Sequence, residues 1–103
     1  MANKSNFRVK ANGFVYGREI IVQTNNFPDY VFKNNYQLKP LLEVEKYIAE
    51  HEHLQGFEKA SVYETNGLPI GEVLKIQQEK IEELTLYLIE MKKEINALKK
   101  EKK

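Results

Sequence analysis

The last third of the chain carries an apolar repeat that strongly limits what the chain can fold into. Residues 81–100 read IEELTLYLIEMKKEINALKK, and no proline or glycine follows Gly71. One uninterrupted helix is therefore predicted from residue 70 to about residue 101. At 1.5 Å per residue this helix is a rod of roughly 48 Å. The rod is longer than a domain of about 70 residues can cover, so a stripe along its whole length needs a partner.

Apolar residues recur along this helix with the spacing of a coiled coil. If Leu74 is heptad position a, seven of the eight a and d positions in four heptads are apolar, and the spacing never slips. This pattern indicates a supercoiled seam rather than a helix lying on a globular core. The competing interpretation is an ordinary amphipathic helix packed on residues 14–54. The residues predicted to carry assembly are Leu74, Gln77, Ile81, Leu84, Leu88, Met91, Ile95 and Leu98.

The number of helices in the coil is less clearly specified. Leucine and isoleucine alternate at the a positions, which leaves both a dimer and a trimer open. Gln77 adds either a polar layer that sets the register or an incompletely packed helix end. Leu86, Tyr87 and Ile89 broaden the apolar face beyond the seam. This broadening favours a third helix, or the rest of the chain folding back on the coil.

Residues 14–69 are predicted to form a small α+β head. The sequence FVYGREIIVQT at 14–24 is typical of one or two short strands with a bend at Gly17. Residues 30–32 either add a strand or act as an aromatic anchor. An amphipathic helix is expected from Pro40 to about His51, because apolar residues recur there at helical spacing.

The apolar side chains of this head are expected to form a small core that also binds the coil. They are Phe14, Val15, Tyr16, Ile20, Val22, Tyr30, Phe32, Leu41, Leu42, Val44, Tyr47 and Ile48. Residues 54–69 are interpreted as a loop or short turns, with a brief helix at 59–63 as one option. Residues 1–13 are interpreted as a flexible lead-in or the end of a preceding fibre, and residues 70–103 as the coiled-coil helix.

Composition argues against several classes of function. The net charge is +1 and is evenly spread, with 8 basic and 8 acidic groups in residues 1–69 and 8 and 7 in residues 70–103. No nucleic-acid partner is therefore expected. There is no cysteine, and His51 and His53 lack further ligands at metal-site spacing, so neither a metal nor a cofactor is expected. No apolar run has the length of a membrane span or a signal peptide, so no membrane partner is expected either.

The order of the segments resembles a known family. GFVYGREIIV is followed by PDYVFKNNYQLKPLLEVEKYI, then by NGLPIGE and KIEELTLYLIEMKKEI, over residues 14 to about 100. This order is similar to the C-terminal module of bacterial and phage tail-fibre-like proteins, akin to the intramolecular chaperone domain of endosialidase-type tailspikes. The resemblance implies a homotrimeric module at the extreme C-terminus of a fibrous protein on a virion tail or bacterial surface. Such a module promotes trimerisation and folding of the fibre ahead of it.

Many members of that family cut themselves off with a serine that opens a Ser-Asp-x-Arg-Leu-Lys-like motif, assisted by a lysine. The matching stretch here is PDYVFK, in which Asp29 and Lys33 fit but Pro28 takes the place of the serine. Proline has no hydroxyl to act as a nucleophile. Ser5 and Ser61 are the only serines, and neither precedes an aspartate. Self-cleavage is therefore not expected.

The sequence as a whole predicts an α+β chain in which a small β-rich and helical head precedes a long C-terminal helix that forms a parallel trimeric coiled coil. The predicted function is homotrimerisation, folding and registration of a preceding fibre domain. Two alternatives stay open. The coil could pair with a different protein as an adaptor, or the chain could be a self-processing peptidase that uses another nucleophile.

Overall fold

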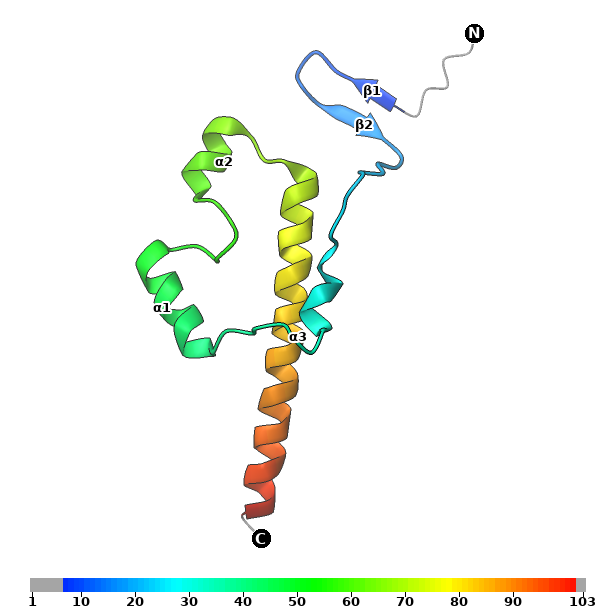
Figure 1. Cartoon of the computed structure of the whole chain (residues 1–103). Helices are drawn as coiled ribbons and strands as arrows, with labels where there is room; N and C mark the ends of the chain where they lie inside the picture. The colour runs from blue at the N-terminus through cyan, green and yellow to red at the C-terminus, as the bar shows by residue number, and fades with distance from the viewer. Residues whose placement is uncertain (1–6, 102–103) are drawn as a thin grey trace.

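The computed structural model describes residues 7–101. Its elements in chain order are the strands β1 (Phe7–Val9) and β2 (Val15–Gly17), the 3-10 helix η1 (Pro28–Phe32), and the helices α1 (Leu41–His51), α2 (Ala60–Asn66) and α3 (Ile70–Glu101). Figure 1 shows α3 as the long axis, with α1 and α2 on one side of it and the chain that leads into η1 on the other. The two strands form a single small sheet, so the predicted α+β class is confirmed.

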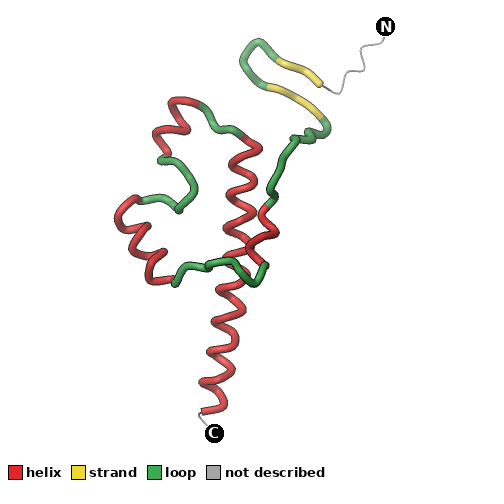
Figure 2. The backbone as a smooth tube through the Cα atoms, in the orientation of Figure 1, coloured by secondary structure: helices red, strands yellow, loops and turns green. Residues whose placement is uncertain are grey.

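Helix α3 begins and ends where the sequence predicts. The backbone N–H of Val73 donates to the carbonyl of Pro69 at 3.0 Å, which continues the hydrogen-bond ladder back to the residue before the helix. Glu72 lies in the first turn and Lys99 and Lys100 in the last, where each charge complements the helix dipole. The structure measures 74 × 32 × 27 Å, and Figure 2 shows the C-terminal part of α3 extending beyond every other element. No other element within residues 7–101 covers this part of the helix.

A β-hairpin lies at the N-terminal end of the described chain. Strands β1 and β2 pair antiparallel, with Arg8 opposite Tyr16 and Val9 opposite Val15. Gly13, at φ 92°, makes the turn possible because a left-handed backbone strains other residues. Residues 1–13 were interpreted as a flexible lead-in or the end of a preceding fibre, and of these residues 7–13 form the first strand and the turn. Residues 1–6 lie outside the described part.

The segment at 30–32 is a turn of 3-10 helix, so its interpretation as a strand is wrong. Pro28 occupies the first turn of η1, where its fixed φ suits a helix and its missing N–H is not needed. The backbone N–H of Lys33 closes the turn on the carbonyl of Tyr30 at 3.1 Å. η1 packs against α3 and is therefore an anchor. Its buried residues are Pro28 and Val31, whereas Phe32 is exposed.

Helices α1 and α2 form an arm that stands away from α3. α1 starts directly after Pro40, close to the expected position, and is followed by Glu52, whose φ of 61° is left-handed. α2 runs further than the brief helix considered at 59–63 and is followed by Gly67, whose φ of 86° favours glycine. Neither helix buries any residue. The local sequence is therefore enough to form the two helices of the arm, but no residue of either helix is buried against the rest of the chain.

The predicted core is wrong for a single chain. The buried hydrophobic residues of the described part are Val31, Val73 and Tyr87. Tyr30, Val44 and Tyr47 are half-buried. The rest of the predicted core is exposed, namely Phe14, Val15, Tyr16, Ile20, Val22, Phe32, Leu41, Leu42 and Ile48. The apolar pattern identifies side chains that avoid water, but it does not say whether their cover belongs to the same chain.

The surface area and the shape of the chain also show that it buries little of its surface. The chain exposes 9309 Å². A compact monomer of its mass, 12.1 kDa, exposes about 6,000 Å². Its radius of gyration is 20.2 Å, against about 13 Å for a compact domain of 100 residues. The single chain thus leaves about 3,300 Å² more surface in water than a compact fold would.

Candidate assembly surface

Helix α3 has two faces with opposite character. Heptad positions b, c, f and g between Val73 and Tyr87 face the rest of the chain, and we call this the covered face. Its half-buried or buried members are Val73, Lys75, Ile76, Glu79, Lys80, Glu82, Glu83, Leu86 and Tyr87. Positions a and d from Leu74 to Leu98 point away, and we call this the open face.

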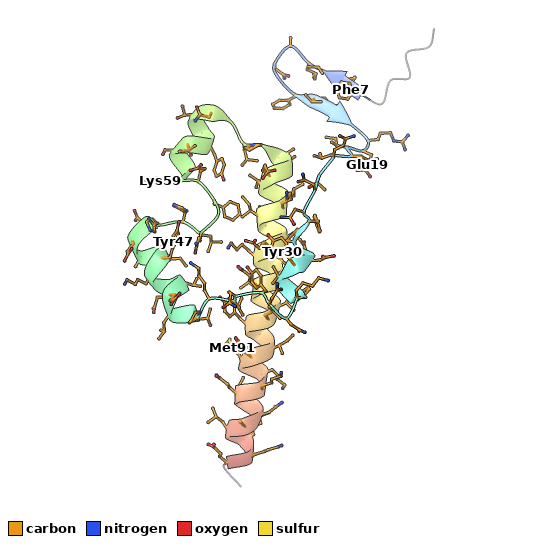
Figure 3. All side chains as sticks on the ribbon, viewed as in Figure 1. Phe7, Glu19, Tyr30, Tyr47, Lys59 and Met91 are labelled. Atoms are coloured by element: carbon orange, nitrogen blue, oxygen red, sulfur yellow. The ribbon has the colours of Figure 1, made fainter. Side chains whose placement is uncertain are left out.

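Two tyrosines fasten the chain around η1 to the covered face. The hydroxyl of Tyr30 donates to Glu79 Oε2, and that of Tyr36 donates to Glu83 Oε2. The two rings also stack at a tilt, with centroids 5.9 Å apart. Figure 3 places Tyr30 against the middle of α3. The partners are almost fifty positions apart in sequence, so these contacts hold the segment around η1 against the middle of α3. We call them the tyrosine clamp.

The carboxylate partners change the acidity of these tyrosines. The hydrogen bond to Glu79, followed by burial and repulsion from the same carboxylate, raises the pKa of Tyr30 to about 12. Burial, followed by the hydrogen bond to Glu83, raises the pKa of Tyr36 well above its usual value. Both hydroxyls therefore stay protonated donors in neutral solution, and the clamp is made of neutral donors on charged acceptors.

A third tyrosine ties α3 to the segment before α1. Tyr87 is 8% exposed, and its hydroxyl donates to the carbonyl of Lys39 at 2.6 Å. Burial raises its pKa above the usual value. Glu82, 4% exposed, accepts a hydrogen bond from Gln78 at 3.0 Å, while its Oε1 is buried without a partner among the described residues. The covered face is thus held largely by polar contacts, in which tyrosine hydroxyls donate to carboxylates and to a backbone carbonyl.

Two glycines mark places where other segments come close to α3. A Cβ added to Gly71 would lie 3.0 Å from Val22 Cγ1, so the loop between β2 and η1 passes the first turn of α3 at close range. Gly56 has φ 98°, and a Cβ there would lie 3.4 Å from Ile76 Cγ2. The loop between α1 and α2 therefore touches the covered face even though both helices stand off.

The structure gathers the predicted seam residues on the open face and leaves them in water. The apolar members are exposed by between 45%, at Ile95, and 65%, at Leu88. Gln77 is exposed as well. Figure 3 shows Met91 on the part of α3 beyond the tyrosine contacts. The competing interpretation, in which this stripe packs on residues 14–54, is wrong, because those residues contact the opposite face or none.

A cleft of about 360 Å³ opens between the arm and α3, and the sequence did not suggest it. Apolar lining comes from Leu41, Val44, Tyr47, Ile48, Leu54, Leu84 and Tyr87. Leu84 is also a d residue of the seam, so the cleft and the open face are continuous. The amphipathic pattern of α1 was the available signal, but it was interpreted as core.

The residues that match the cleavage motif of the resembling family, Pro28, Asp29 and Lys33, lie on η1 or directly after it. Pro28 is fully buried, whereas Asp29 and Lys33 are exposed at the two ends of the turn. The motif position that carries the nucleophile in the resembling family is therefore turned inward here. Neither exposed residue is part of the tyrosine clamp.

The two histidines flank an aromatic ring. The ring centroid of Tyr47 lies 4.1 Å from that of His51 and 5.7 Å from that of His53. No set of three or more histidine, cysteine, aspartate or glutamate side chains within residues 7–101 is arranged to hold a metal ion. Among the helices of the same residues, none combines the length and apolarity needed to cross a bilayer.

Comparisons of the chain with protein-family models, with curated proteins and with solved structures found no match.

Proposed function

We propose that this chain is a homotrimerisation and registration module of a fibrous phage tail or bacterial surface protein. Three copies of α3 would associate in parallel through the open face, and the fibre domain of the parent chain would precede the module. The observation that carries this proposal is the open face itself. It is a seam over four heptads in which every a and d position except Gln77 is apolar, and every member of it is exposed in the single chain.

The amount of uncovered surface supports an assembly of this size. A standard protein interface buries about 800 Å² on each partner, and each subunit of a trimer takes part in two interfaces. The chain exposes about 3,300 Å² more than a compact monomer, which is ample for both. Large exposed apolar surfaces on soluble proteins mark interaction sites.

The mechanism follows from the order of elements. Three α3 helices in register would hold the three heads at high mutual concentration, so later contacts between copies need no further diffusional search. In a parallel coil Glu94 at position g would face Lys99 at position e of the neighbour. Such an exposed pair contributes only a few tenths of a kcal/mol, and it favours parallel orientation more than strength.

The module would remain attached to its fibre. Pro28 supplies no hydroxyl where the resembling family has its nucleophile, and its side chain is buried. Intact mass measured after prolonged incubation tests this point. A fragment that begins near Pro28 or Asp29 would favour a self-processing peptidase instead.

The absolute mass in solution, measured by light scattering on a size-exclusion column over a concentration series, tests the proposal directly. A stable mass near three times 12.1 kDa supports it. A stable dimer would keep self-assembly but correct the copy number. A monomer that persists at high concentration would overturn it and leave an adaptor whose coil pairs with a different protein.

A further inference from the structure

We propose that α3 of a second copy occupies the cleft between the arm and α3, so that α1 clasps the neighbouring helix of the coil from outside. This inference rests on the proposed self-assembly and adds a second contact surface to it. The occupant is thus a second copy of this chain, at the height of the cleft.

The cleft is built like half of a helix-binding groove. One wall is the apolar side of α1, with Val44 and Ile48, and the other is α3, with Leu84 and Tyr87. Leu84 belongs to both the seam and the cleft, so a helix packed on the seam at this height borders the cleft directly. The tyrosine and glutamate contacts of the covered face keep the segment before α1 in place.

The arm needs such an occupant for its own stability. α1 has only 11 residues and buries none of them. Isolated helices shorter than about 12 to 15 residues are marginal in water, and helices in proteins depend on packing of their apolar face. Figure 1 shows α1 connected to the body only through the segments at its two ends. A neighbouring helix in the cleft would cover its apolar side.

The matching surface exists on α3 itself. Position e faces the neighbour's g side in a parallel coil, and here the e residues are Gln78 and Thr85 near the cleft but Lys92 and Lys99 beyond it. The flank formed by Thr85, Leu88 and Ile89 is uncharged, and all three are exposed in the single chain. The cleft lining also includes the charged residues Lys39, Glu79, Lys80 and Glu83. An uncharged flank against the apolar part of this lining is the complementarity that a desolvated contact requires. The lysines lie where no arm is present.

Cross-linking between differently tagged chains tests the contact, and the absence of cysteine makes it clean. Ile48→Cys is placed on one chain and Thr85→Cys on another chain with a tag of different mass. The two are unfolded, mixed, refolded together and treated with a short bismaleimide. We expect a covalent pair of one chain of each kind. Lys99→Cys replaces Thr85→Cys in the matched control, because it is also at position e but lies roughly 21 Å further along α3 and should not link.

A second variant measures the strength of the contact. Ile48→Asp places a charge on the cleft wall, whereas Ala49→Asp places the same charge on an exposed residue outside the cleft. Losing the burial of one isoleucine should raise the concentration at which the oligomer half-dissociates by roughly tenfold to a hundredfold. The control should leave it nearly unchanged. Equal effects of the two variants would overturn the inference.

The outcomes separate the inference from the proposed function. A trimer in which residues 48 and 85 of different chains cross-link supports both. A trimer without that link, or one that links only within a double variant of a single chain, overturns the clasp and keeps the assembly. A monomer overturns both. Binding of a different protein in the cleft, with the chain itself monomeric, would do the same.

Discussion

The two faces of α3 differ in a way that reverses the usual arrangement of a protein helix. The face that the chain covers itself carries Glu79 and Glu83, which accept hydrogen bonds from tyrosine hydroxyls, and the buried Glu82. The face that it leaves in water is apolar from Leu74 to Leu98, apart from Gln77. A monomeric protein packs its apolar face inward, because burial of apolar surface is the main favourable term in folding. The proposed assembly would need this arrangement, because it leaves the open face free for other helices.

The largest expected effect comes from breaking the open face. Ile81→Asp would place a carboxylate in the middle of the seam, where burying an unpaired charge costs several kcal/mol. Assembly should be lost, and much of the head should unfold with it. Light scattering and circular dichroism measure both. Lys93→Asp, on the exposed side of the same helix, is the matched control and should leave the oligomer intact. A folded and unchanged oligomer carrying Ile81→Asp would rule the seam out.

The next effect comes from breaking the covered face without touching the seam. Val31→Ala removes two methyl groups from a side chain that is 1% exposed against α3. The cavity should lower the free energy of unfolding by on the order of 2 kcal/mol, as judged by urea denaturation. Val9→Ala makes the same chemical change at a residue that is 65% exposed and should cost far less. Similar losses in the two variants would mean that η1 is not anchored on α3.

Alkaline pH should weaken the covered face while leaving the aliphatic seam uncharged. Tyr30 has its pKa raised to about 12 in the folded chain, against 10.0 for an unperturbed tyrosine. The folded state therefore holds this proton more tightly, so its contribution to stability is complete below about pH 10 and is lost as the pH rises through about 12. The free energy of unfolding should fall over that interval.

Tyr30→Phe provides the control for this titration. The variant should be less stable at neutral pH, because Glu79 loses its donor, and its unfolding free energy should fall less steeply between about pH 10 and 12. Tyrosinate absorbance measured along the same pH series would show the step near pH 12 disappear. An identical pH dependence in both proteins would contradict the contact between Tyr30 and Glu79.

The smallest expected effect tests whether the loop before η1 contacts the first turn of α3. Gly71→Ala favours the helix, by at most about 1 kcal/mol, but its new Cβ would approach Val22 Cγ1 at 3.0 Å. The two contributions should nearly cancel. In the Val22→Ala background the contact disappears, and the same change should become stabilising. A double-mutant cycle in urea measures this coupling, and a coupling of zero would mean that Val22 does not lie on α3.

Features that depend on neighbouring residues could be predicted from the sequence, whereas features that depend on contacts between distant residues could not. The bounds of α3 and the start of α1 were predicted, because helical period, proline and glycine act within a few residues. The 3-10 turn at Pro28 was missed, because the run YVF is typical of strands and its anchoring on α3 is a distant contact. The pairing of Tyr36 with Glu83 had no local signal, since 47 positions separate them.

The sequence by itself determined the long helix, its seam and the side chains that would avoid water. A heptad repeat specifies these locally, because each apolar position recurs on one side of the helix whatever surrounds it. Only the tertiary structure decided which face the head takes and how far the arm stands from α3. Hydrogen bonds from Tyr30, Tyr36 and Tyr87 to groups distant in sequence make that choice. Such contacts depend on which distant segments the fold brings together, and the local apolar repeat carries no information about that.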